Sequence, residues 1–284
     1  MREAAAPEAS VRRAAVLGKP IAHSLSPVIH NAGYAAAGLD GWSYTRIECA
    51  AAELPALVAR LGPEWAGLSV TMPGKEAALA VAAEVSPVAA AVGAANTLVR
   101  RADGSWFADN TDVTGMVEVL TEAGVRAGAT VTVLGAGGTA RAALAAAARL
   151  RAAEVRVVAR RPAAIAELAP VAAVLGVPMV AAPWPVPGSE PSPLADTDVL
   201  ISTVPKGAVD ELADSVPWRA GTVVFDAIYD PWPTPLAASA EAAGCRIVSG
   251  LDLLLAQAIG QFEQFTGVPA PRSAMAAALA AARS

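Results

Sequence analysis

Cysteine and histidine are scarce in this sequence, which has two residues of each. Cys49 and Cys245 lie far apart and lack the CxxC spacing of metal sites and redox dithiols. This usage argues against a disulfide framework and fits a reducing compartment such as the cytoplasm. His23 and His30 have no Cys or Glu partner at metal-ligand spacing, so we assign both to loop structure and expect no metal site.

Uncharged hydrophobic runs of membrane-spanning length are also missing, although hydrophobic residues make up 55% of the chain and the mean hydropathy is +0.45. The excess is mostly alanine, and Arg141 and Arg151 bracket one long apolar stretch. Residues 1–13 carry scattered charges and no apolar segment of the kind found in secretory signals. The composition therefore predicts alanine-rich amphipathic helices in a soluble protein.

Clusters of lysine or arginine are absent, and the formal net charge is -5. Nucleic acid and anionic lipid are therefore poor candidates for the main partner, and a small molecule is favoured. The length of 284 residues suits two domains in one chain. The sequence leaves the oligomeric state open between monomer and homodimer.

Short β-like runs alternate with helical stretches along the chain, which predicts an α/β fold. In the first part, to about Gly115, the predicted strands are residues 13–17, 42–48, 67–71 and 96–100, with a helical stretch at 53–61. A second α/β unit opens at Val131 and continues with strands from Val155, in DVLIST and in TVVFDAI, which indicates a doubly wound sheet. The proline-rich residues 182–193 predict a surface loop, and helices are expected at 251–266 and from Arg272.

A glycine-rich segment directly follows the apolar run VTVL and directly precedes a predicted helix. Gly135, Gly137 and Ala140 form the pattern GxGxxA in the context typical of dinucleotide-binding sites. Because glycine has no side chain, the backbone can approach a pyrophosphate closely, and the helix N-terminus offers free N–H groups. We predict a nucleotide site made by Gly135, Ala136, Gly137, Gly138 and Thr139.

The residues after the next predicted strand favour NADP over NAD. A site that prefers NAD usually has Asp or Glu there, whereas this chain has Ala159, Arg160 and Arg161. Guanidinium groups can pair with a 2′-phosphate through charge-assisted hydrogen bonds. The alternative is that both arginines are solvated loop charges.

Six separated motifs together resemble the shikimate dehydrogenase family over nearly the whole chain. They are GKPIAHSLSPVIHN from Gly18, LSVTMPGK from Leu68, GAANT from Gly93, DNTD from Asp109, GAGGTAR from Gly135 and GLDLLLAQ from Gly250. The resemblance implies an N-terminal α/β substrate lobe (1–115), a Rossmann-like NADP lobe (116–250) and C-terminal helices (251–284) that return to the first lobe. It also implies reversible, NADPH-dependent reduction of 3-dehydroshikimate to shikimate, a step towards chorismate and the aromatic amino acids.

The resemblance assigns roles to particular residues. Lys75 and Asp112 would be the catalytic pair and would also touch the substrate, because an alkoxide formed by hydride transfer needs a proton donor. Ser24 and Ser26 would hold the substrate carboxylate, with Pro27 restricting Ser26 to extended conformations; the alternative is that the serines cap a helix. The other implied polar substrate contacts are Thr71, Asn96, Tyr229 and Gln257, and Ala227 and Gly250 would lie near the nicotinamide.

Three positions depart from the family pattern. Ser69 stands where the family often has Asn, and Ala159 and Arg161 replace neutral polar residues on either side of Arg160. Val113 replaces the glycine that commonly follows NTD.

Three other functions remain as alternatives. They are an NAD-dependent quinate/shikimate dehydrogenase, an NADP-binding sensor without activity, and a dehydrogenase of similar shape that acts on another ring. The lack of an acidic residue near Arg161 counts against the first, and the presence of both Lys75 and Asp112 counts against the second.

Overall fold

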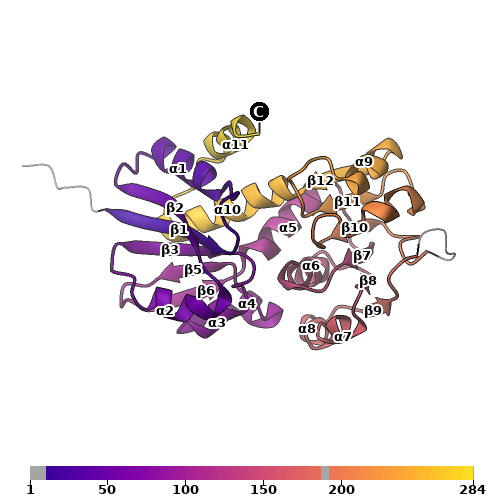
Figure 1. Ribbon diagram of the computed structural model, residues 1–284, viewed down its shortest axis with the longest axis horizontal. Coiled ribbons are helices and arrows are strands. Elements are labelled where there is room, and N and C mark those ends of the chain that lie inside the picture. Colours follow the sequence, from indigo (N-terminus) through magenta and orange to yellow (C-terminus); the bar gives the residue numbers. More distant parts are fainter. Residues whose placement is uncertain (1–10, 187–191, 284) are drawn as a thin grey trace, which may run out of the picture. The chain divides into compact units, whose positions relative to one another are not determined.

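The computed structural model describes residues 11–186 and 192–283, and the chain divides into two compact units (Figure 1). Unit 1 comprises residues 1–85, 95–109 and 258–284, and unit 2 comprises residues 86–94 and 110–257. The chain therefore passes between the units at residues 85/86, 94/95, 109/110 and 257/258, and one long helix contributes to both units.

Unit 1 is built on a mixed sheet with the strand order β2-β1-β3-β5-β6-β4. Its strands are β1 (Arg12–Gly18), β2 (Trp42–Glu48), β3 (Trp65–Val70), β4 (Glu84–Val85), β5 (Thr97–Arg100) and β6 (Trp106–Asp109). Strand β1 pairs in parallel with β2 and β3, whereas β5 is antiparallel to β3 and β6. The carboxyl ends of β1 and β3 therefore lie side by side, with the amino end of β5 next to them.

Helices cover the sheet of unit 1. They are α1 (Ser26–Ala36), η1 (Ala51–Glu53), α2 (Leu54–Val58), α3 (Ala77–Ala80), the second half of α10 (Gly250–Thr266) and α11 (Arg272–Ala281). Helix α11 packs against α1 (Figure 1). A Cβ atom on Gly67 of β3 would lie 2.0 Å from the Phe265 ring, so glycine is what allows α10 to lie directly on the strand.

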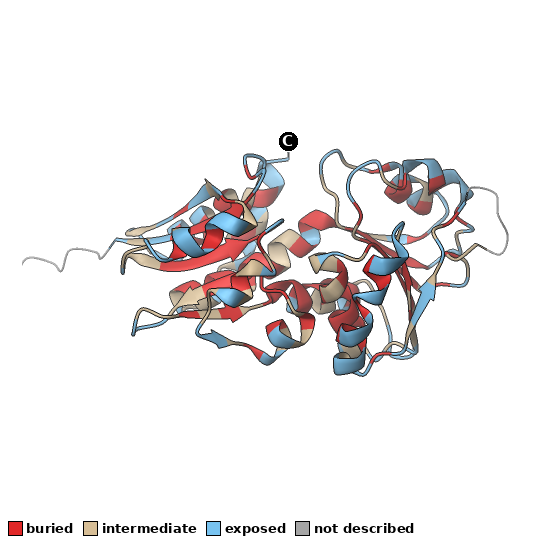
Figure 2. Cartoon of the chain, turned by 60° about the horizontal axis from the view of Figure 1, so that its bottom comes forward, coloured by how far each residue is buried: buried red, intermediate tan, exposed pale blue. Residues whose placement is uncertain are grey.

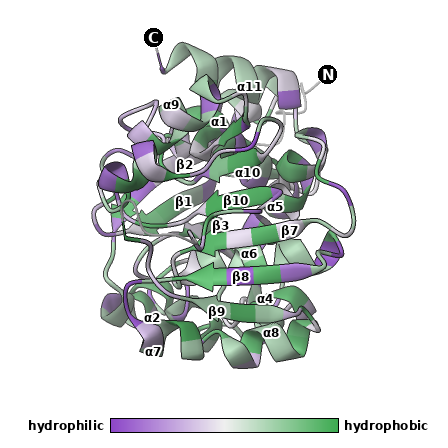
Figure 3. Ribbon diagram, turned by 90° about the vertical axis from the view of Figure 1, so that its right-hand side faces the viewer, coloured by the Kyte–Doolittle hydropathy of each residue, from purple (hydrophilic) through white to green (hydrophobic). Residues whose placement is uncertain are grey.

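Unit 2 contains an entirely parallel sheet with the strand order β12-β11-β10-β7-β8-β9. Its strands are β7 (Thr130–Leu134), β8 (Glu154–Val158), β9 (Met179–Ala182), β10 (Val199–Ser202), β11 (Val223–Asp226) and β12 (Arg246–Ser249). Figure 3 shows apolar residues dominating β7 and β10, as expected for strands that are covered on both faces. The strand order reverses between β7 and β10, which is the topological switch point where such sheets bind ligands.

The helices of unit 2 each have a buried and a more exposed side (Figure 2). They are α4 (Pro87–Val92), α5 (Thr111–Glu122), α6 (Gly138–Arg149), α7 (Pro162–Ala166), α8 (Ala169–Leu175), η2 (Asp210–Ser215), α9 (Pro235–Ala242) and the first half of α10. In α6, Ala142, Ala143 and Ala146 are fully buried. Their small side chains allow the helix to pack close to its neighbours.

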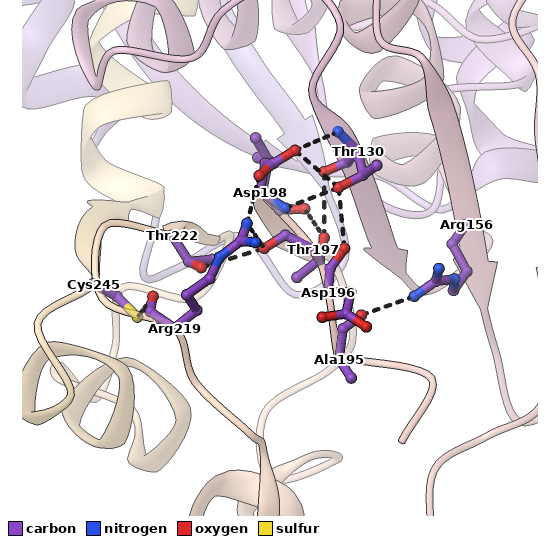
Figure 4. A network of polar contacts seen from close by, with 10 residues as sticks. Thr130, Arg156, Ala195, Asp196, Thr197, Asp198, Arg219, Thr222 and Cys245 are labelled. Carbon is purple, nitrogen blue, oxygen red and sulfur yellow. Dashed lines mark hydrogen bonds and ion pairs between the residues drawn. The ribbon is translucent and has the colours of Figure 1, made fainter. Parts of the chain in front are cut away.

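A polar network ties together the amino ends of the strands in unit 2 (Figure 4). Asp198 accepts hydrogen bonds from the backbone N–H and the hydroxyl of Thr130, at 2.9 and 3.0 Å, and it forms an ion pair with Arg219. The Thr130 bonds and Arg219 hold the pKa of the Asp198 carboxyl below its usual value. This network fixes the amino edge of the sheet, opposite the edge that carries the glycine-rich loop.

The predicted α/β class is confirmed, and the strands predicted at 13–17 and 42–48 and the helix predicted at 251–266 coincide with β1, β2 and α10. Of the predicted loop at 182–193, residues 187–191 lie outside the described part of the chain. Within the described residues, no helix has the length and apolar character needed to cross a bilayer.

Candidate functional site

In unit 1, the loops that follow β1 and β3 are held together by their backbones. The Thr71 N–H donates to the Leu17 carbonyl at 2.8 Å, and the Lys19 N–H donates to the Met72 carbonyl at 3.1 Å. A Cβ atom on Gly18 would lie 2.5 Å from the Thr71 methyl group, so the two loops approach as closely as a glycine allows. Thr71 is thereby placed beside the loop that leads to Ser24 and Ser26.

The two candidate serines lie at the start of α1. The Ser26 N–H donates to Ser24 Oγ at 3.3 Å, and the guanidinium of Arg46 on β2 donates to the Ser24 carbonyl. The prediction that Ser26 is extended is wrong, because Ser26 is the first residue of α1, where Pro27 is well tolerated. The N-cap is Leu25, so the alternative in which a serine is the capping residue is not observed.

Lys75 and Asn96 arise from neighbouring backbone segments of unit 1. Pro73 and Gly74 turn the chain after β3, and the Lys75 carbonyl accepts a hydrogen bond from the Ala95 N–H at 2.8 Å. The next residue, Asn96, is 3% exposed, and its carbonyl accepts from the Val70 N–H at 2.7 Å. The fold therefore gathers Ser26, Thr71, Lys75 and Asn96 at one edge of the sheet.

Beneath these residues lies a chain of buried polar side chains that the sequence analysis missed. The Tyr44 hydroxyl donates to Ser69 Oγ at 2.6 Å, and Ser69 Oγ donates to Gln261 Oε1 at 2.6 Å. Gln261 Nε2 donates to the Thr97 hydroxyl at 3.1 Å, and that hydroxyl donates to Asn96 Oδ1 at 2.8 Å. The available signal was Gln261 itself, since it lies one helical turn after Gln257 on the same face of a mostly apolar helix.

His30 packs against this chain and is not a loop residue, which corrects the prediction. It lies in α1 with no exposed surface, and its ring stacks on Tyr44 with a centroid distance of 4.1 Å. Desolvation lowers the pKa of the His30 imidazole to about 3, so the ring is neutral near pH 7. Burial also raises the pKa of the Tyr44 phenol, which therefore stays protonated.

Asp112 and Gln257 both belong to unit 2. Asp112 is the second residue of α5 and 6% exposed, and a carboxylate is favourable in the first turn of a helix. Gln257 is 7% exposed. A Cβ atom on Gly115 of α5 would lie 3.1 Å from the Gln257 backbone nitrogen, so α5 packs closely on the first half of α10.

The glycine-rich loop joins β7 to α6 at the switch point of the parallel sheet. Gly135 has a φ of +112°, and a Cβ atom on it would lie 2.4 Å from Thr203 Oγ1, so both conformation and space require glycine. Gly137 is the N-cap of α6, and a Cβ atom on it would have no neighbour within 4 Å. The space in front of the α6 N-terminus is thus open to a ligand, and the free N–H groups of the first turn suit a phosphate.

Arg160 and Arg161 follow β8, the parallel neighbour of β7. Both are exposed, and Arg161 is the N-cap of α7. Because parallel strands end at the same edge of a sheet, the two guanidinium groups arise beside the glycine-rich loop. This edge therefore combines helix N–H groups with two cations, and it suits a nucleotide that carries an additional phosphate.

The candidate residues near the nicotinamide, Ala227 and Gly250, touch each other. A Cβ atom on Gly250 would lie 2.2 Å from the Ala227 carbonyl oxygen, so no other residue fits at the start of α10. Asp226 directly precedes Ala227. Its carboxylate accepts from the Thr234 hydroxyl at 2.7 Å and from the Ile228 N–H at 3.1 Å. These bonds shape the loop that carries Tyr229.

Two family models match parts of this chain. Residues 16–98 match the model of the shikimate dehydrogenase substrate binding domain, and residues 250–280 match that of the shikimate 5'-dehydrogenase C-terminal domain. A shikimate dehydrogenase (NADP(+)) of Anaeromyxobacter sp. is 40% identical over 94% of this chain and 95% of its own length.

The chain belongs to the shikimate dehydrogenase family. A solved shikimate dehydrogenase of Mycobacterium tuberculosis is 48% identical, with a TM-score of 0.85 over 95% of this chain and 99% of that one. A shikimate 5-dehydrogenase structure from Mycobacterium fortuitum is 49% identical, with a TM-score of 0.82 over 94% and 97% of the two chains.

Two departures from the shikimate dehydrogenase pattern have a structural explanation. Ser69 is 4% exposed and its hydroxyl bridges Tyr44 and Gln261, so its side chain is committed within the protein. Val113 is fully buried in a cluster with Val92, Ala94 and Ala142, so it fills core space between helices. The replacement of the two residues beside Arg160 is explained by nothing in the structure.

Proposed function

We propose that this protein is an NADP-dependent shikimate dehydrogenase, which reduces 3-dehydroshikimate to shikimate reversibly. The observation that carries the proposal is the pairing of a glycine-rich loop with two arginines at the switch point of a parallel sheet. A relative that covers 94% of the chain and a solved structure that covers 95% of it are both named as shikimate dehydrogenases.

The residues present fit NADP. The N–H groups at the start of α6 and the open space at Gly137 would receive the pyrophosphate, while Arg160 and Arg161 would pair with the 2′-phosphate. When bound, the nicotinamide supplies or accepts the hydride. Ala227, Tyr229 and Gly250 would line its ring.

Ser24 and Ser26 would donate hydrogen bonds to the substrate carboxylate. Thr71, Asn96, Tyr229 and Gln257 would bind ring hydroxyl groups without adding charge, and such sites reject analogues that lack the hydroxyls. Ser26, Asn96 and Gln257 are each less than one-tenth exposed, so each is held by its surroundings before a ligand arrives.

Lys75 and Asp112 would handle the proton. During reduction, the carbonyl oxygen gains negative charge, and the Lys75 ammonium would donate a proton to it; in the oxidative direction the lysine amine would take the hydroxyl proton. Asp112 would be the acidic partner of Lys75 in this step. Both residues would also contact the reacting end of the substrate.

Initial rates at 340 nm with shikimate and quinate, each against NADP+ and NAD+, test the proposal. Shikimate with NADP+ should dominate, and Lys75→Ala and Asp112→Asn should each lower kcat by about 10²- to 10⁴-fold. Arg101→Ala, which removes an exposed cation of unit 1, is the matched control and should retain activity. Quinate with NAD+ dominating would establish the alternative dehydrogenase, and no rate with any pair would favour a binding protein without activity.

Two further features of the proposal concern the setting of the protein. Cys49 and Cys245 are both unpaired buried thiols, which suits a reducing compartment, so we place the enzyme in the cytoplasm. A monomer and a homodimer remain equally compatible with the proposed activity, and sedimentation of the purified protein distinguishes them.

A further inference from the structure

The buried polar chain of unit 1 has a defined direction, which follows from counting protons. The amide group of Gln261 donates from Nε2 to the Asn96 backbone carbonyl at 3.1 Å, and a carbonyl can only accept. This bond fixes which end of the Gln261 amide is nitrogen. Its oxygen, Oε1, can therefore only accept from Ser69 Oγ.

The same count fixes every other hydroxyl in the chain. Ser69 has one proton and gives it to Gln261, so the Tyr44 hydroxyl must donate to Ser69. On the other side, Thr97 Oγ1 accepts from Gln261 Nε2, and its single proton goes to Asn96 Oδ1.

The result is a continuous, one-way chain from Tyr44 through Ser69, Gln261 and Thr97 to Asn96. All five residues belong to unit 1 and are less than one-tenth exposed. Hydrogen bonds in such a dry environment are stronger than in water, and a buried donor without an acceptor is costly. The arrangement therefore resists the flip of any one amide or hydroxyl.

We propose that Gln261 and Thr97 are positioning residues that hold the Asn96 side chain in one of its two amide orientations. The Thr97 hydroxyl donates to Asn96 Oδ1, so the orientation that it favours directs the oxygen end of the amide towards Thr97. In this orientation Nδ2, which can only donate, would be the end of the amide that binds a substrate oxygen. This inference rests on the proposed function, in which Asn96 binds a substrate hydroxyl.

Thr97→Val tests the proposal, because it removes the proton that orients Asn96 while nearly preserving shape. Gln261→Met does the same one step earlier in the chain. We expect the KM for shikimate to rise about tenfold in both, with the KM for NADP+ changed less than about twofold. Thr97→Ser, which restores the hydroxyl, should recover the parent KM.

Two variants on α10 are matched controls. The Thr266 hydroxyl donates to the Phe262 carbonyl at 2.8 Å and accepts from the Val268 N–H at 3.2 Å. Gln264 Nε2 donates to Asp109 at 2.8 Å, so Thr266→Val and Gln264→Met both remove side-chain hydrogen bonds outside the buried polar chain. Neither should alter the KM for shikimate. Equal effects in the controls and the test variants would overturn the proposal.

A double-mutant cycle with Asn96→Ala separates positioning from general destabilisation. If Thr97 acts through Asn96, then Thr97→Val should have no further effect on the shikimate KM in the Asn96→Ala background. Effects that multiply would overturn the proposal. Parent protein that turns over no shikimate would instead contradict the proposed function, so the two failures are distinguishable.

Discussion

Ser69 Oγ donates to Gln261 Oε1 at 2.6 Å, although the two residues are 192 positions apart in the chain. One comes from β3 near the start of the protein and the other from α10 near its end. Both side chains are buried, so this bond connects α10 to the sheet of unit 1. It also gives a physical meaning to a residue that differs from the usual asparagine of the family.

Ser69→Asn, which restores the residue common in the family, should destabilise this protein. The larger amide has no room between Tyr44 and Gln261, which both lie 2.6 Å from the Ser69 oxygen. We expect a loss of about 1–3 kcal/mol in the free energy of unfolding, measured in urea. Ser43→Asn, on the exposed face of β2, is the control and should change little. A Ser69→Asn variant as stable as the parent protein would contradict this prediction and would show that the buried hydrogen bonds can rearrange around the larger side chain.

Gly137→Ala should weaken NADP+ binding without weakening the fold. The new methyl group would meet no protein atom within 4 Å, so it would project into the space assigned to the pyrophosphate. We expect the KM for NADP+ to rise at least about tenfold, with the KM for shikimate and the melting temperature nearly unchanged. Gly135→Ala should differ by losing stability, because of its φ of +112° and its contact with Thr203. Unchanged cofactor kinetics in Gly137→Ala would contradict the proposed site.

Arg160→Asp should reduce the preference for NADP+. A carboxylate at this position would repel the 2′-phosphate and accept hydrogen bonds from a ribose that lacks it. We expect kcat/KM for NADP+ to fall by about tenfold or more, with that for NAD+ maintained or raised. Arg126→Asp makes the same change of charge on an exposed residue before β7, at the opposite edge of the sheet. If Arg160→Asp and Arg126→Asp lower kcat/KM for NADP+ equally, the cause is the change in net charge, and the prediction for Arg160 is wrong.

His30 should make the stability of the protein fall with acid. Its pKa is lowered from 6.5 to about 3 by burial, so between these values the unfolded chain binds a proton that the folded chain rejects. The contribution of His30 to stability is therefore complete above pH 6.5 and is lost as the pH falls towards 3, at up to about 1.4 kcal/mol per pH unit. His30→Phe keeps a ring on Tyr44 and should remove this part of the slope. The free energy of unfolding is measured for both proteins between pH 7 and pH 4. If it changes with pH by the same amount in the parent protein and in His30→Phe, the assignment is refuted.

Much of the fold could be predicted because local patterns carry it. The apolar run before Gly135, the glycines and the helix after them are continuous in sequence, so the glycine-rich loop between β7 and α6 was predictable without a structure. The strands β1 and β2 were likewise predictable from short runs of apolar and β-branched residues. The strand β4 has two residues, too few for such a pattern, and was missed, and the four-residue strand β6 was missed as well.

The sequence by itself determined the α/β class, the dinucleotide loop and the identity of the side chains available for chemistry. Only the tertiary structure decided how those side chains are oriented. Tyr44, Ser69, Thr97 and Gln261 come from three strands and a helix, and no spacing along the chain connects them. The hydrogen bonds form because packing excludes water from these groups and leaves each buried donor a single acceptor, a condition that exists only in the folded chain.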